Sequence, residues 1–115
     1  MEVIEEKQDA VYIFRLLGRL DSNTSPAFEK KIISAIEEGE STVVVDFESL
    51  DYISSAGLRV LLKAAKQLKK SEGRIHLCSM KDYIKEVFDI AGFTTFLPVY
   101  SSLDDAVKEM ANPGR

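Results

Sequence analysis

Cysteine, histidine and tryptophan are scarce in this 115-residue sequence, which has one cysteine, one histidine and no tryptophan. The single cysteine, Cys78, excludes an intramolecular disulfide and is typical of a reducing compartment. No apolar run approaches the roughly 20 residues that cross a bilayer. The acidic first residues also lack the apolar segment of a signal peptide. We therefore expect a cytoplasmic protein with no membrane span.

The sequence also has no excess of basic residues, since it contains 15 lysines and arginines and 19 aspartates and glutamates. There is thus no electrostatic reason to expect a nucleic acid partner. Hydrophobic residues make up 45% of the chain and charged residues 30%, which is typical of a folded domain. The length suits one domain, which we expect over residues 1–111, followed by a disordered tail over residues 112–115.

Motifs for catalysis and metal binding are missing as well. The sequence has no phosphate-binding loop of the GxxxxGK or GxGxxG kind. His76 and Cys78 alternate on one face of a predicted strand, and with a single copy of each and no nearby partner pair we interpret them as packing residues rather than metal ligands. No nucleophile elbow accompanies the only histidine, which argues against a serine hydrolase. Asp46, Glu48 and Asp51 match no calcium-binding loop. We expect no enzyme activity, no metal and no cofactor of the chain's own.

Asp46 ends a predicted strand, as the phosphorylated aspartate does in bacterial receiver domains. A receiver would also need an acidic pair after its first strand and a lysine after its last. This chain has the single Asp21 and Pro98 at those places. We therefore interpret Asp46 as a structural or supporting carboxylate.

The pattern of apolar residues and turn formers predicts five strands and four helices. The strands are a short one at Val3 and Ile4, then Val11–Leu17, Thr42–Phe47, Arg74–Cys78 and Phe96–Val99, with Glu5 to Ala10 as a hairpin connection. The first predicted helix begins at Ser25-Pro26 and is ended by Gly39, and the second runs from Ser55 to Glu72 and is stopped by Gly73. The third is capped by Ser79 and ended by Gly92. The fourth is capped by Ser101 or Ser102. The expected buried face of the third helix is Ile84, Val87, Phe88 and Ala91.

This order of elements predicts the topology. Three consecutive strand–helix–strand units require parallel pairing, and only the opening hairpin can be antiparallel. We therefore predict an α/β single domain with a mixed, mostly parallel five-stranded sheet packed with four helices.

Two polar loops follow predicted parallel strands, Gly18–Ser25 and Glu48–Ser54. In open α/β sheets, binding sites gather beyond the carboxyl ends of such strands. Both loops lead into predicted helix N-termini, so we expect the functional site at this end of the sheet.

The second loop ends in two serines, Ser54 and Ser55, at the start of a long predicted helix. A serine at a helix start is most simply an N-cap worth about 1 kcal/mol. One serine suffices for that, and the second hydroxyl would lie where unsatisfied amides and the helix dipole favour a phosphate. We expect the small residues Ala56 and Gly57 to leave room for another protein's active site.

On the face opposite its apolar residues, the same helix carries a basic stripe formed by Arg59, Lys63, Lys66 and Lys70. Such a stripe is usually a solvated helix face, and it can also meet an acidic partner. The sequence leaves both interpretations open.

Two motifs on this fold resemble the STAS domain of the bacterial anti-sigma factor antagonist family. The first is Gly18-Arg19-Leu20-Asp21, followed by Thr24 and a helix. The second is Asp51-Tyr52-Ile53-Ser54-Ser55-Ala56-Gly57-Leu58. The likeness extends over nearly the whole chain.

The resemblance implies partner switching. In this family the unphosphorylated antagonist binds an anti-sigma factor that is also a serine kinase, and the sigma factor is freed. The kinase uses ATP to phosphorylate the antagonist, which then dissociates, and a serine phosphatase resets it. We expect this chain to work as a monomer in that cycle.

The family's phosphoserine matches Ser55, and Asp21 matches the aspartate of the neighbouring loop. Many members have aspartate where this chain has Ser54, so Ser54 is an alternative phosphorylation site. The resemblance also implies a surface that faces the partner or a nucleotide, comprising Asp21, Asn23, Thr24, Ser54, Ala56, Gly57 and Arg59. The alternative function is a STAS module that binds a nucleotide or small anion at the same helix start without phosphorylation.

Overall fold

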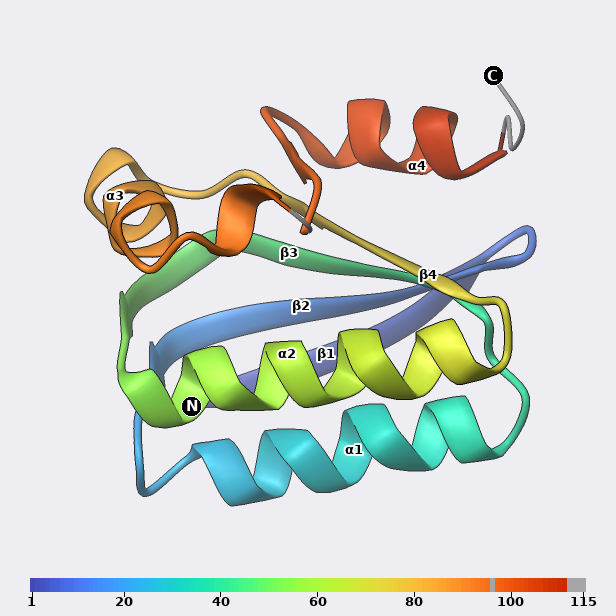
Figure 1. Ribbon diagram of the computed structural model, residues 1–115, viewed down its shortest axis with the longest axis horizontal. Coiled ribbons are helices and arrows are strands. Elements are labelled where there is room, and N and C mark those ends of the chain that lie inside the picture. The colour runs from blue at the N-terminus through green and yellow to red at the C-terminus, as the bar shows by residue number, and fades with distance from the viewer. Residues whose placement is uncertain (96, 112–115) are drawn as a thin grey trace.

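A computed structural model describes residues 1–95 and 97–111 of the chain (Figure 1). In this part of the chain, one sheet contains β1 (Glu2–Gln8), β2 (Val11–Leu20), β3 (Thr42–Ile53), β4 (Arg74–Cys78) and β5 (Val99–Tyr100). The helices are α1 (Ser25–Glu37), α2 (Ser55–Lys70), α3 (Asp82–Ile90) and α4 (Leu103–Ala111), with a 3-10 turn at Phe93–Thr95.

The strands lie in the order β1-β2-β3-β4-β5. β1 pairs with β2 antiparallel, and the other three neighbouring pairs are parallel. The prediction of a mixed, mostly parallel sheet with four helices is therefore confirmed. No helix in the described residues is long and apolar enough to cross a membrane.

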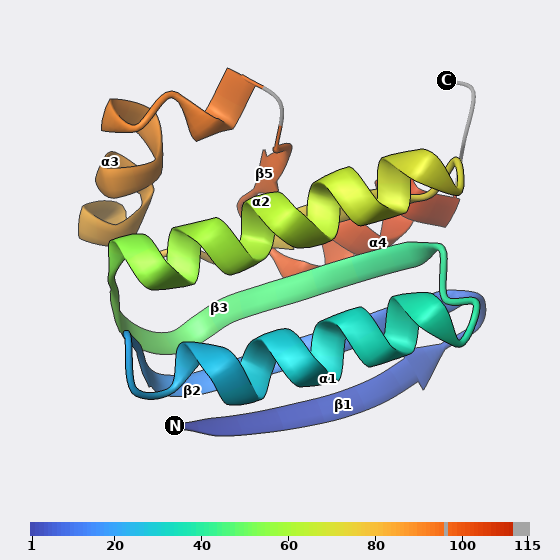
Figure 2. The ribbon, with the colours of Figure 1, turned by 60° about the horizontal axis from the view of Figure 1, so that its bottom comes forward.

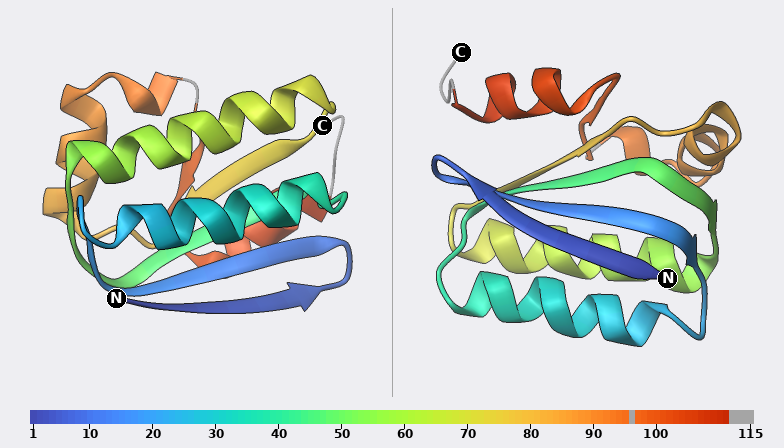
Figure 3. Two further views of the ribbon diagram at one scale, coloured as in Figure 1. Left: turned by 90° about the horizontal axis from the view of Figure 1, so that it is seen from below. Right: turned by 180° about the vertical axis from the view of Figure 1, so that it is seen from behind.

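The helices cover the two faces of the sheet unequally. α1 and α2 lie side by side on one face and α4 on the other, while α3 lies near one end of the sheet (Figures 1, 2 and 3). The α1–α2 face buries the larger core, in which Phe14 packs edge-on against Phe28 with 5.9 Å between the ring centroids. The α4 face buries a smaller cluster centred on Ile13, Val44 and Cys78.

β3 is longer than predicted, because it runs on to Ile53 through the segment expected to be a loop. A bulge explains the difference: two β3 residues, Phe47 and Glu48, lie opposite one residue of β2. The carboxylate Oδ1 of Asp46 accepts a hydrogen bond of 3.0 Å from the Glu48 backbone N–H. The bulge interrupts the alternation of apolar and polar residues, so the sequence pattern ends at Phe47 although the strand does not.

β1 also extends well beyond Val3 and Ile4, and only Asp9 and Ala10 form the turn. The predicted connection was too long, because β1 is an edge strand on which charged side chains stay exposed. Phe96, the first residue predicted for the last strand, and the expected tail at residues 112–115 lie outside the described residues.

Glycine ends two helices as predicted. Gly39 and Gly92 follow α1 and α3 in the left-handed region, with φ of 110° and 79°. After α2 the prediction was wrong, because Glu72 takes the left-handed conformation with φ of 60°. Gly73 packs against the backbone instead: a Cβ there would lie 2.7 Å from the carbonyl oxygen of Ser41.

The third helix is shorter and less buried than predicted. It begins after Lys81 rather than Ser79, which adopts a φ of 63°. Its nine residues bury Ile84 and Phe88, but Val87 and Ala91 are exposed, because so short a helix contacts the core along one narrow stripe. Ser102 caps α4 as expected, since its hydroxyl accepts a 3.1 Å hydrogen bond from Asp105 N–H.

Candidate functional site

The two segments predicted to carry the site meet at one end of the molecule. Leu20, the last residue of β2, pairs with Ile53, the last residue of β3. The next residue, Ser54, donates its backbone N–H to the Leu20 carbonyl at 2.9 Å. The N-termini of α1 and α2 therefore lie close together at this end of the sheet (Figure 3).

Ser54 occupies the N-cap position of α2 with extended backbone angles. Its carbonyl accepts a 3.0 Å hydrogen bond from Leu58 N–H, which begins the helix. The simple capping interpretation fails for the side chain, because the Ser54 hydroxyl makes no cap bond. Its oxygen is buried and has no hydrogen-bond partner among the described residues.

Ser55, in contrast, is the first residue of α2 and is exposed. Its hydroxyl belongs to the turn where backbone amides are unsatisfied and the helix dipole is positive. The first turn of α2 contains no acidic residue that would already balance this dipole. The two adjacent serines therefore differ sharply, with one hydroxyl enclosed and one accessible.

Gly57 does not leave room for a partner, and that prediction was wrong. Gly57 is buried, and a Cβ at this position would lie 2.8 Å from Leu20 Cγ and 2.9 Å from Ile53 Cγ1. The absence of a side chain instead lets α2 approach the ends of β2 and β3 closely. Ala56 is half-buried beside it.

Asp21 shapes the loop before α1. Its Oδ1 accepts hydrogen bonds from the backbone N–H groups of Asn23 at 2.9 Å and Thr24 at 3.1 Å. The Thr24 hydroxyl accepts from Asp21 N–H at 2.9 Å and donates to the Arg19 carbonyl at 2.8 Å. One carboxylate oxygen of Asp21 is thus used within its own loop, which leaves Asn23 exposed at the tip.

Desolvation is the largest influence on the pKa of Asp21 and raises it. The hydrogen bonds from Asn23 and Thr24, together with the nearby charge of Arg19, outweigh desolvation and lower the pKa overall. The carboxylate therefore stays ionised at neutral pH.

Arg19 and Tyr52 form a contact that sequence reasoning missed. They are paired across β2 and β3, and the Arg19 guanidinium lies 4.2 Å from the centre of the Tyr52 ring. Arg19 Nε also lies 3.7 Å from Asp21 Oδ2. The pair lies beyond two register shifts between β2 and β3, one after Arg15 and one after Gly18, and the predicted third strand ended before it reached Tyr52.

The start of α3 holds the segment just before the serines. Lys81 Nζ donates to the Leu50 carbonyl at 3.1 Å and lies 3.0 Å from Asp51 Oδ1. The Tyr83 hydroxyl donates to the Asp51 carbonyl at 2.8 Å. No local sequence signal predicts these contacts, because they join residues about 30 positions apart.

His76 and Cys78 lie away from this end and are buried on the α4 face. Nδ1 of His76 is 3.2 Å from the Ala106 carbonyl oxygen, and burial lowers the pKa of His76. Burial also raises the pKa of Cys78 to about 12, so its thiol is not a nucleophile at neutral pH. Within the described ranges, no three histidine, cysteine or acidic side chains gather in a possible metal site.

Comparisons with known proteins agree with the fold and the motifs. The sequence matches the STAS domain family over residues 2–106. It is 41% identical over 106 residues to BtrV of Bordetella bronchiseptica, which is named an anti-sigma factor antagonist. That alignment covers 92% of this chain and 91% of BtrV.

Solved structures share the fold at lower sequence identity. The Thermotoga maritima protein TM1081 has a TM-score of 0.92 at 18% identity, covering 96% of this chain and 95% of that chain. The Bacillus protein SpoIIAA, solved in its phosphorylated form, has a TM-score of 0.76 at 24% identity, covering 94% of this chain and 98% of that chain. The family match and the similarity to BtrV identify this chain as a STAS domain protein of the anti-sigma factor antagonist family.

Proposed function

We propose that this protein is an anti-sigma factor antagonist controlled by phosphorylation of Ser55. In its unphosphorylated form it binds an anti-sigma factor with serine kinase activity, and the sigma factor is released. The kinase then transfers phosphate from ATP to Ser55, the complex separates, and a serine phosphatase restores the antagonist. The chain itself is not an enzyme and needs no cofactor in this cycle.

The single observation that carries the proposal is the difference between the two serines. A kinase must bring its ATP to the hydroxyl that it modifies, and only Ser55 presents an exposed side chain. The hydroxyl oxygen of Ser54 is buried at the start of α2. Ser55 therefore fits the acceptor role better than Ser54.

The position of Ser55 also explains how one phosphate could switch binding without unfolding the domain. A phosphate adds nearly two negative charges, and a helix N-terminus stabilises such charge by about 0.3–1 kcal/mol. At a protein interface an unpaired buried charge costs about 2–5 kcal/mol. That range corresponds to a loss of roughly thirty-fold to several-thousand-fold in affinity.

Several neighbours would form the surface that meets the kinase. Asn23 and Arg59 are exposed, and Thr24 and Ala56 are half-buried. Arg59 lies four residues after Ser55, one helical turn along α2. Gly57 acts beneath this surface, by bringing α2 against the strand ends.

Phosphate mapping tests the proposal. The protein is incubated with its cognate anti-sigma kinase and ATP, and the modified residue is located by mass spectrometry. We expect one phosphate on Ser55, its complete loss in Ser55→Ala and its retention in Ser54→Ala. Phosphate on Ser54 alone would transfer the role to Ser54, and no phosphate on either would overturn the switch.

A further inference from the structure

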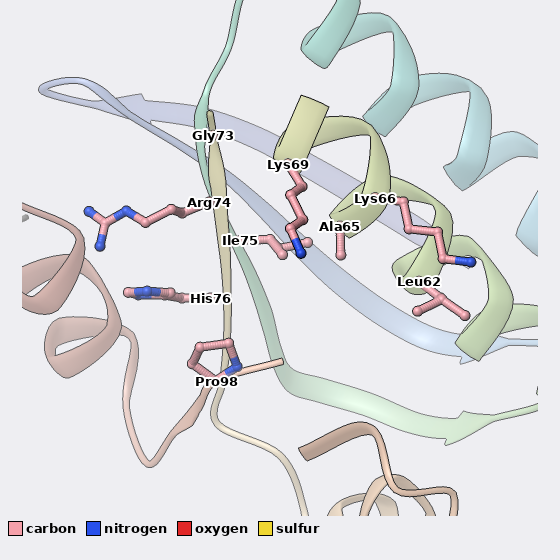
Figure 4. A pocket seen from close by; sticks show the side chains of 9 residues that line it. All are labelled: Leu62, Ala65, Lys66, Lys69, Gly73, Arg74, Ile75, His76 and Pro98. Carbon is pink, nitrogen blue, oxygen red and sulfur yellow. The ribbon is translucent and has the colours of Figure 1, made fainter. Parts of the chain in front are cut away.

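A pocket runs along β4, on the part of α2 remote from Ser55 (Figure 4). We call it the β4 pocket, and its volume is about 680 Å³. It is lined by Leu62, Ala65, Lys66, Lys69, Gly73, Arg74, Ile75, His76 and Pro98. None of these residues belongs to the proposed phosphorylation site.

The short length of β5 creates the pocket. β5 pairs only with Leu77 and Cys78 of β4. Among the described residues, no strand pairs with Arg74–His76 on the edge of β4 that faces away from β3. The second half of α2 lies over this edge and forms one wall.

The walls of the β4 pocket are partly apolar. Ile75 is buried, and Leu62 and Ala65 are half-buried on the helix facing it. Figure 4 shows Ala65 and Lys69 reaching from α2 toward Ile75. Small-molecule sites typically have volumes of about 300–1,000 Å³ and mainly apolar walls, so the β4 pocket is large enough for a small organic ligand.

The charges around the β4 pocket are all of one sign. Lys66, Lys69 and Arg74 line it, and no carboxylate side chain does. Neither Lys66 nor Lys69 forms an ion pair with any residue that the structure describes. Arg74 donates one N–H to the Met110 carbonyl at 2.9 Å, and its guanidinium has further donors.

His76 adds no charge to this set at neutral pH, because burial lowers its pKa. Arg74 and His76 project from the side of β4 opposite Ile75 (Figure 4). The cations therefore surround an apolar centre rather than forming one compact phosphate site. An anion in the pocket would relieve the mutual repulsion of the three cations.

We propose that the β4 pocket binds a small amphipathic organic anion. Its apolar body packs against Leu62, Ala65 and Ile75, and its carboxylate or sulfonate is held by Lys66 and Lys69 on the α2 side. Arg74 adds positive charge from the opposite side of β4 (Figure 4). This binding site is independent of Ser55, since it uses the other half of α2 and the edge of β4.

Two anionic probes test the proposal on the whole chain. The fluorescent probe 8-anilinonaphthalene-1-sulfonate and decanoate are each titrated into the protein, by fluorescence and calorimetry respectively. We expect saturable binding of one molecule per chain, and at least tenfold weaker binding of decyltrimethylammonium, which has an alkyl chain one carbon longer than that of decanoate and a positive head. Absence of saturable binding by both anions, or equal binding of the cation, would overturn the proposal.

Matched charge reversals on α2 then locate the binding. The double variant Lys66→Glu/Lys69→Glu should lower the affinity for both anions at least tenfold. The control Lys63→Glu/Lys70→Glu makes the same charge change on the same helix outside the β4 pocket and should lower it less than twofold. Equal losses in both variants would show attraction to the whole helix and contradict the proposal, provided that circular dichroism shows both variants folded.

Discussion

The two ends of α2 are built in opposite ways. At its N-terminus, Gly57 packs against Leu20 and Ile53 so closely that a Cβ would clash. In its second half, Ala65 lines a pocket of about 680 Å³ with cations around it. The first end is closely packed and exposes the Ser55 side chain, which suits recognition by another protein. The second is a space that suits a small ligand.

The largest expected effect comes from enlarging one side chain in the first turn of α2 and one in its second half. Gly57→Ala should lower the free energy of unfolding by about 1–3 kcal/mol, because Leu20 and Ile53 must move. This loss would occur although alanine is the better helix former by about 1 kcal/mol. Ala65→Met should change stability by less than about 1 kcal/mol, since its side chain can enter the β4 pocket. Urea unfolding measures both, and equal effects would show that the two ends do not differ.

A second prediction concerns the contacts that hold the strand before Ser55. Lys81→Met should destabilise the protein by about 1 kcal/mol, because the Leu50 and Glu48 carbonyls lose their lysine donor. Lys85→Met on the same helix is the control and should be nearly neutral, since Lys85 is exposed. If chemical denaturation gives the two variants the same stability, Lys81 does not support this end.

A smaller effect is expected at Ser54. Ser54→Asp should raise the free energy of unfolding by about 0.5–1 kcal/mol, because a carboxylate at the N-cap accepts from free amides and interacts favourably with the helix dipole. The serine hydroxyl leaves this stabilisation unused, since it makes no cap bond. A decrease in stability would mean that the enclosed site cannot accommodate the larger side chain.

The smallest effect is a pH dependence at Asp21. Its pKa is lowered in the folded protein, so its ionised form contributes stability above the ordinary aspartate pKa, and that contribution is lost as pH falls through the lowered value. Asp21→Asn should therefore lower Tm slightly at pH 7, and the difference from wild type should shrink below about pH 4. Asp89→Asn, an exposed change on α3, serves as the control. A difference that grows in acid would contradict the assignment.

The sequence predicted the fold well because the apolar pattern is regular in the strands and helices that form the core. Val43, Val44 and Val45 read as a strand covered on both faces, and all three are buried. Prediction failed where pairing depends on distant residues. The bulge after Asp46 interrupts the apolar pattern, so the second half of β3 was not predicted as a strand. The contacts of Lys81 with that half have no local sequence signature.

The placement of the candidate site residues in the fold was predicted in part. The motifs placed Ser54, Ser55 and Asp21 at one end of the sheet, and the structure brings their segments together through Leu20 and Ile53. Which serine is accessible could not be read from two identical adjacent side chains. Gly57 was assigned to partner access, because a sequence does not show whether a glycine faces solvent or a neighbouring strand.

Control of partner binding by phosphorylation of Ser55 can be measured as the affinity of the anti-sigma kinase for the two forms of this protein. Calorimetric titration of the kinase with unphosphorylated protein and with protein phosphorylated on Ser55 gives the ratio of the two Kd values. We predict binding at least thirty-fold weaker for the phosphorylated form, with far-UV circular dichroism unchanged. Equal Kd values for the two folded forms would show that phosphorylation of Ser55 does not control binding.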